Sequence, residues 1–122
     1  MKISDDHNQR MAKMIFASVY PLYLTKVVNK GRTEKELQLV IEWLTGFNAG
    51  EQKKLIQEKV NFETFFGRAN LNPQAKTITG LICGYRIEEI ENKLTQKVRY
   101  LDKLVDELAK GKKMDKILRT VN

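Results

Sequence analysis

The stretch that decides the fold lies at residues 78–110 and reads ITGLICGYRIEEIENKLTQKVRYLDKLVDELAK. Its apolar residues recur every three or four positions, as they do along one face of a helix, and the later ones come close to a heptad repeat. This spacing predicts a long, amphipathic C-terminal helix. The apolar positions of the stripe are Ile78, Leu81, Ile82, Tyr85, Ile87, Ile90, Leu94, Leu101, Leu104 and Leu108.

The continuity of this helix across residues 74–110 is left open by the sequence. Gly84 could break it, and so could the pair Glu91 and Asn92. The segment TITGLIC at residues 77–83 contains enough β-branched side chains to form a short strand instead. We favour a helix there because the apolar residues keep the helical spacing.

Helix-capping signals divide the preceding residues into several shorter helices. The segment TEKE at residues 33–36 has the composition of a capping box, in which a hydroxyl and a carboxylate bond each other's backbone amides, and Gly46 supplies a stop. Asn48 and Asn61 are the expected caps of two further helices. Pro21 suits the first position of a helix, so we expect it to divide the N-terminal helical segment in two.

The composition is that of a globular protein. The chain has 122 residues, of which 42% are hydrophobic and 30% are charged, and this excludes the disordered and fibrous classes. Its length suits one domain with a packed core. We therefore predict an all-α, multi-helical single domain at residues 11–122, preceded by a flexible tail at residues 1–10.

Cysteine usage and hydropathy favour a cytoplasmic location. Cys83 is the only cysteine, so no disulfide can form within the chain, and a reducing compartment is expected. The apolar run at residues 14–24 is too short to cross a membrane, and Pro21 interrupts it. No cleavage site of the secretory type follows the run directly. We predict neither a membrane span nor a signal peptide.

No catalytic, cofactor-binding or metal-binding motif is recognised. Gly80 and Gly84 lack the third glycine of a dinucleotide-binding loop. Cys83 could be a reactive thiol beside Arg86, but a small buried hydrophobic side chain is the favoured interpretation. His7 is the only histidine, and we expect it in the flexible tail rather than at a metal. We predict no cofactor and leave open whether the chain is an enzyme.

Self-association is expected at the long helix. Gly80 and Gly84 are four residues apart and would let a second helix approach closely. The apolar stripe is too long for about five short helices to cover within one subunit, so a homodimer is predicted. The candidate helix-contact surface comprises Gly80, Gly84, Ile87, Leu94 and Leu101.

A second candidate surface is basic. The net charge is +7, and the excess of Lys and Arg lies at the two ends of the sequence. Such clusters attract nucleic-acid phosphates. The favoured alternative is a short helix that docks an apolar side on the core and turns its lysines outward. The candidate basic patch comprises Lys110, Lys112, Lys113, Lys116 and Arg119.

Six segments together resemble the family called domain of unknown function 2200, which comprises small prokaryotic proteins. They occur in order between residues 11 and 119. The resemblance implies a multi-helical fold, and it implies no activity, cofactor or catalytic residue. The segments are FASVYPLYLTKVVNKGRT, IEWLTGF, NFETFF, ITGLICGYRIEEIENKL, VRYLDKLVDELAKGK and MDKILR.

Three classes of function are consistent with these features, in decreasing order of preference. The first is an oligomeric interaction or structural protein, which binds a second copy or a protein partner. The second is a nucleic-acid-binding module that uses the basic ends. The third is a small-ligand binder or enzyme with a cleft near Tyr20, Tyr23, Arg86 and Arg99.

Overall fold

The fold is built almost wholly from helices. The computed structural model describes residues 3–120, and within them it contains seven α-helices and one two-stranded sheet. The all-α prediction is therefore confirmed, apart from that small sheet. The elements in chain order are α1 (Asp5–Lys13), α2 (Phe16–Val28), α3 (Glu34–Thr45), α4 (Ala49–Gln57), α5 (Phe62–Arg68), η1 (Pro73–Thr77), β1 (Leu81–Ile82), β2 (Tyr85–Arg86), η2 (Ile87–Glu89), α6 (Lys93–Ala109) and α7 (Met114–Ile117).

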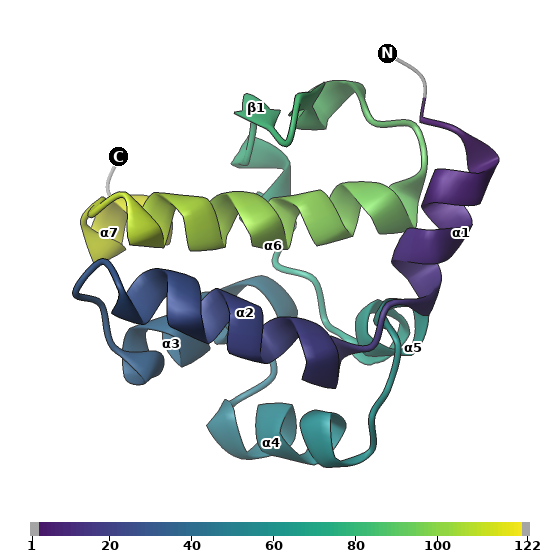
Figure 1. Cartoon of the computed structure of the whole chain (residues 1–122). Coiled ribbons are helices and arrows are strands. Elements are labelled where there is room, and N and C mark those ends of the chain that lie inside the picture. The colour runs from purple at the N-terminus through teal and green to yellow at the C-terminus, as the bar shows by residue number, and fades with distance from the viewer. Residues whose placement is uncertain (1–2, 121–122) are drawn as a thin grey trace.

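Helix α6 lies across the middle of the molecule, and the other elements pack around it (Figure 1). It contacts α1, α2, α3, α5 and α7. Its apolar side chains are covered by these neighbours, with Leu101, Leu104 and Leu108 at 0% exposure. The argument that a second copy is needed to cover the stripe is therefore wrong for the part on α6, which the chain covers unaided, whereas Leu81 on the hairpin stays 57% exposed. Association through another surface stays a prediction.

The predicted helix across residues 78–92 does not form. A hairpin takes its place, in which Leu81 pairs with Arg86 and Ile82 pairs with Tyr85. The two residues at its tip, Cys83 and Gly84, have φ angles of 51° and 82°. Positive φ at both central residues is the requirement of a type I′ hairpin turn. Helical spacing alone did not reveal this turn signal.

The candidate helix-contact surface is consequently dispersed. Gly84 lies in the hairpin turn, and Gly80 precedes the first strand with a φ of +97°. Ile87 and Leu101 are fully buried within the chain itself. These residues therefore do not form one exposed helix face. The break foreseen at Glu91 and Asn92 is real, because the Asn92 side chain caps α6 by accepting from the Thr95 amide.

The N-terminal residues also differ from expectation. Residues 5–10, predicted as part of a flexible tail, belong to α1, which is capped by the Ser4 side chain. Met1 and Lys2 lie outside the described residues. The break that follows α1 falls at Met14 and Ile15, where Ile15 bridges to Asn61. Helix α2 then continues through Pro21 rather than starting there.

The other capping predictions are confirmed. Thr33 and Asn48 each form a complete capping box with the residue three positions later. Asn61 caps the start of α5. Gly46 is the C-cap of α3, in a left-handed conformation with a φ of 79°. Each of these caps depends only on residues within one helical turn, so it forms however the helices pack on one another.

Packed aromatic rings join α2 to α5. Phe16 stacks on Phe65 with ring centroids 4.3 Å apart, and Phe62 and Phe66 surround the pair. Helix α4 packs on α2 and α3. Three helices therefore meet at a corner away from α6, and that corner holds the site described next. No helix among residues 3–120 has the length and apolarity needed to span a membrane.

Candidate ligand-binding pocket

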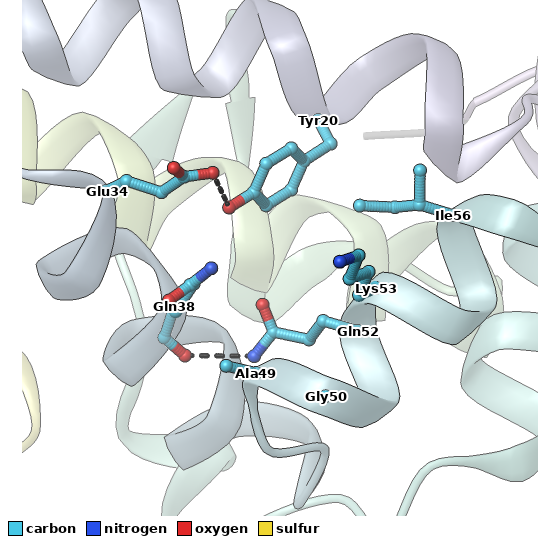
Figure 2. A pocket seen from close by; sticks show the side chains of 8 residues that line it. All are labelled: Tyr20, Glu34, Gln38, Ala49, Gly50, Gln52, Lys53 and Ile56. Atoms are coloured by element: carbon cyan, nitrogen blue, oxygen red, sulfur yellow. Dashed lines mark hydrogen bonds between the residues drawn. The ribbon is translucent and has the colours of Figure 1, made fainter.

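A pocket of about 450 Å³ lies where α2, α3 and α4 meet (Figure 2). Helix α2 contributes one wall through Tyr20, and the start of α3 contributes Glu34. Helix α4 supplies the largest share of the lining because its first two turns face the opening. The residues that line the pocket are Tyr20, Glu34, Gln38, Ala49, Gly50, Gln52, Lys53 and Ile56.

Gln52 is the buried polar residue of this pocket, with an exposed fraction of 1%. Its amide nitrogen donates to the backbone oxygens of Gln38, at 3.0 Å, and Phe47, at 2.9 Å. Carbonyl oxygens only accept, so these two bonds fix which end of the amide is nitrogen. The side-chain oxygen Oε1 is then left without a hydrogen-bond partner. A buried acceptor in that state requires a donor.

Tyr20 and Glu34 form the polar edge opposite Gln52. The Tyr20 hydroxyl donates to Glu34 Oε2 at 2.8 Å. Burial, the hydrogen bond to Glu34 and the charge of Glu34 together raise the pKa of Tyr20 from 10.0 to about 12, against an opposing effect of the Gln38 side chain. The phenol is therefore protonated at neutral pH, and Glu34 and the Gln38 side chain are its hydrogen-bond partners.

A second set of polar side chains gathers around Asp102 of α6. We call it the Asp102 cluster, and its members are His7, Tyr23, Tyr85, Arg99 and Asp102. Tyr23 donates to Asp102 Oδ1 at 2.5 Å, and Arg99 donates to Asp102 Oδ2 at 2.9 Å. His7 Nε2 lies 3.4 Å from the Arg99 guanidinium, and the centroid of the Tyr85 ring lies 5.5 Å from Arg99 Cζ. The cluster thus ties α1, α2 and the hairpin to α6.

Burial dominates the electrostatics of the Asp102 cluster. Burial first, and then the charge of Asp102, raise the pKa of Tyr23 well above its usual value. Arg99 is 8% exposed, and its Nε has no hydrogen-bond partner. The remaining guanidinium nitrogens bond within the cluster, and the Tyr85 ring covers the cation. The arrangement suits a structural joint between elements.

The predicted cleft near Tyr20, Tyr23, Arg86 and Arg99 does not exist as one site. Tyr20 lines the pocket, whereas Tyr23 and Arg99 belong to the Asp102 cluster. Arg86 is exposed on the hairpin and lies 3.9 Å from Glu89. The four residues come from α2, the hairpin and α6, and they face different elements.

Two single residues also differ from prediction. Cys83 is exposed at the hairpin turn, so the buried interpretation is wrong. His7 lies in α1 against Arg99 rather than in a flexible tail. Within residues 3–120, no group of three or more His, Cys, Asp or Glu residues is placed to hold a metal ion.

The candidate basic patch is partly neutralised by the chain's own carboxylates. Lys110 pairs with Asp106 at 3.0 Å, while Lys112 and Arg119 both pair with Glu107. Lys113 and Lys116 are exposed and have no ion pair with any described residue. Ile117 is fully buried, so α7 docks its apolar side on the core as the favoured alternative requires.

Sequence reasoning missed Gln52 and Glu34. The available signal was the position of Gln52 three and four residues before Leu55 and Ile56, which places a polar side chain on the apolar face of a short helix. Glu34 carries no signal beyond its place in the first turn of α3. Only the packing of α2 brings Tyr20 to it.

Comparison with known proteins places the chain among uncharacterised relatives. A family model described as "Uncharacterized protein conserved in bacteria (DUF2200)" matches residues 10–119. A solved structure, titled "Crystal structure of uncharacterized protein SP1917", is 41% identical. It superposes with a TM-score of 0.85, and the match covers 92% of this chain and 93% of that one. No curated protein matches.

Proposed function

Because this chain belongs to the DUF2200 family of uncharacterised bacterial proteins, whose description assigns no activity, we propose a function from the site itself: the protein binds a small polar ligand between α2, α3 and α4. The single observation that carries the proposal is the unpartnered Oε1 of Gln52, a residue 1% exposed, at a pocket of about 450 Å³. Small-molecule sites combine a concave shape of this size with a few fixed polar groups.

The alternative explanation of Gln52 is purely structural, and it accounts for only half of the side chain. The amide nitrogen does bridge α3 to the loop before α4. That role leaves the oxygen unpaired at a cost of about 1–3 kcal/mol. A ligand donor in the pocket that Gln52 lines would recover this free energy.

A pair of glycine substitutions tests the proposal. Gly50 lines the pocket, whereas Gly67 lies on α5 with nothing within 4 Å of its Cβ position, and neither has a positive φ. Gly50→Phe should fill the pocket, and Gly67→Phe is the matched control. A diverse library of small metabolites is screened by thermal shift and by amide chemical shifts against both variants and the unaltered chain.

We expect at least one compound to stabilise the unaltered chain and Gly67→Phe but not Gly50→Phe. At 100 times its Kd, a ligand stabilises by about 2.7 kcal/mol, which is roughly 10 °C in Tm for this size of domain. A screen in which no compound distinguishes the two variants would contradict the proposed function.

The partner, domain and compartment predictions also continue as proposals. One core cluster includes residues from Met11 to Ile117, which supports a single domain. The exposed thiol of Cys83 suits a reducing compartment such as the cytoplasm. A homodimer now needs a surface other than the stripe on α6, and sedimentation at micromolar concentration measures it directly.

Nucleic-acid binding is the second candidate function, favoured by Lys113 and Lys116, which have no ion pair among the described residues. Phosphate contacts release counterions, so genuine binding must weaken steeply between low and physiological salt. The double variant Lys113→Gln, Lys116→Gln should reduce that salt dependence. Binding that is absent at low salt, or insensitive to salt, would rule this function out.

A further inference from the structure

We propose that the pocket ligand is a small zwitterion of the amino-acid type, whose ammonium group donates to Gln52 and Glu34 and whose anionic group faces Lys53. This inference rests on the proposed function and names the chemistry of its ligand. It is drawn from the distribution of donors, acceptors and charges around the pocket.

One side of the pocket consists of acceptors. Gln52 Oε1 can be satisfied only by a donor, since its amide orientation is fixed by two carbonyl partners. Glu34 contributes a full negative charge, and its carboxylate has no cationic partner within residues 3–120. The Tyr20 hydroxyl donates to Glu34 and already interacts with the Gln38 side chain, so it holds the Glu34 carboxylate in place rather than offering a free acceptor. A primary ammonium group carries three N–H donors, enough for the Gln52 oxygen and the two oxygens of the Glu34 carboxylate.

The other side of the pocket is positive. Lys53 is exposed and has no ion pair with a described residue. The first turn of α4 lies below it, where the amides of Ala49 and Gly50 are among those that no intrahelical carbonyl can satisfy. Helix α4 has nine residues, so its N-terminus adds a partial positive charge. Gly50 has no side chain to block an approach to these amides.

The two sides are separated, which is why a singly charged ligand fits less well. Figure 2 shows Glu34 and Lys53 on opposite sides of the Gln52 amide. No ion pair joins Glu34 to Lys53, so each keeps a charge that a ligand can neutralise. A simple amine would leave Lys53 unpaired, and a simple carboxylate would face Glu34 and the Gln52 oxygen. Charged groups of this kind bind strongly when both partners are matched.

The volume supports the same class. A space of about 450 Å³ falls within the ordinary range for small-molecule sites. The ring of Tyr20 and the side chain of Ile56 line it as well. The hydrocarbon part of an amino acid would lie against Ile56.

Matched sets of compounds test the inference. Each set contains an amino acid, the carboxylic acid that lacks its amino group, the amine that lacks its carboxylate, and a neutral amide of similar size. Binding is measured by amide chemical shifts and by calorimetry on the full chain. We expect the zwitterion of at least one set to bind tenfold or more tightly than the other three members.

Four single variants assign the two ends of the ligand. Glu34→Gln should weaken binding of the amine and the zwitterion tenfold or more, whereas Glu42→Gln, an exposed carboxylate on the same helix, should not. Lys53→Gln should weaken the zwitterion toward the affinity of its matched amine. Lys54→Gln is the control for that change, because Lys54 lies next to it but outside this pocket.

The outcomes separate this inference from the proposed function. A ligand without an ammonium group that is blocked by Gly50→Phe would overturn the zwitterion and leave the pocket function standing. Zwitterion binding that is equally sensitive to Glu42→Gln and Glu34→Gln would also overturn it. If no compound binds in a manner blocked by Gly50→Phe, both proposals fail.

Discussion

Tyr20 and Tyr23 lie three residues apart on α2, and each donates its hydroxyl to a carboxylate, yet the two sites differ in kind. Tyr23 reaches Asp102 on α6, where Arg99 completes an ion pair inside the fold. Tyr20 donates to Glu34 on α3, whose carboxylate has no cationic partner among the described residues and lines the pocket. The first carboxylate is neutralised by the chain, and the second is left for an outside partner.

This difference separates structural polar groups from binding groups. In the Asp102 cluster, the guanidinium and carboxylate cancel, so removing either should damage the fold. In the pocket, Gln52 Oε1 and the charges of Glu34 and Lys53 remain unmatched within residues 3–120. Substitutions at the pocket edge should therefore alter ligand binding more than folding.

The largest expected effect comes from Asp102→Ala. The substitution leaves Arg99, at 8% exposure, without its carboxylate and leaves the buried Tyr23 hydroxyl without an acceptor. Breaking such a pair from one side costs about 3–5 kcal/mol. Urea denaturation measures it, with the exposed Asp115 on α7 changed to alanine as the control, expected to cost less than about 1 kcal/mol. A loss at Asp102 no larger than that control would show that the cluster is not a structural joint.

The two tyrosines give a direct contrast of intermediate size. Tyr23→Phe removes a buried hydrogen bond to a charged group and should cost about 1.5–3 kcal/mol. Tyr20→Phe removes a bond to the exposed Glu34, which water can replace, and should cost about 0.5–1.5 kcal/mol. Urea denaturation of both variants measures the difference. Equal losses, or a larger loss at Tyr20, would erase the distinction between the sites.

The alkaline pH dependence of stability gives the smallest effect over the interval measured, pH 10 to 11. The pKa of Tyr20 is about 12 in the folded chain and 10.0 when unperturbed, so the folded state holds its proton more tightly. The contribution is fully present below pH 10 and is lost as pH rises from 10 toward 12, at up to about 1.4 kcal/mol per pH unit. Tyr20→Phe should lose stability less steeply than the unaltered chain between pH 10 and 11. Identical slopes in urea denaturation would refute the raised pKa.

Local signals along the chain were predictable because they act within a few residues. The capping boxes at Thr33 and Asn48 form as their residue types require. The stop at Gly46 and the cap at Asn61 follow for the same reason. The stripe through Leu101, Leu104 and Leu108 is the buried face of α6. In each case the cause is backbone hydrogen bonding or helical period, which sequence displays directly.

The hairpin was missed because two patterns overlapped in one segment. Ile78, Ile82 and Tyr85 fit a helical stripe, while Cys83 and Gly84 fit a type I′ turn. Glycine adopts the positive φ that the turn needs without strain, whereas a positive φ at a cysteine carries a small strain. The partners that favour the hairpin, such as Lys103 donating to the Leu81 carbonyl, lie far along the chain.

The sequence by itself determined that this protein is helical, where most of its helices begin, and which side of α6 is buried. Tertiary structure alone decided that the stripe on α6 is covered without a second copy, that Tyr20 and Tyr23 serve different sites, and that Gln52 has an unpaired oxygen. The physical reason is range. Helical period and capping depend on neighbours within one turn, whereas burial, pairing of charges and the satisfaction of an acceptor depend on which distant segments pack together.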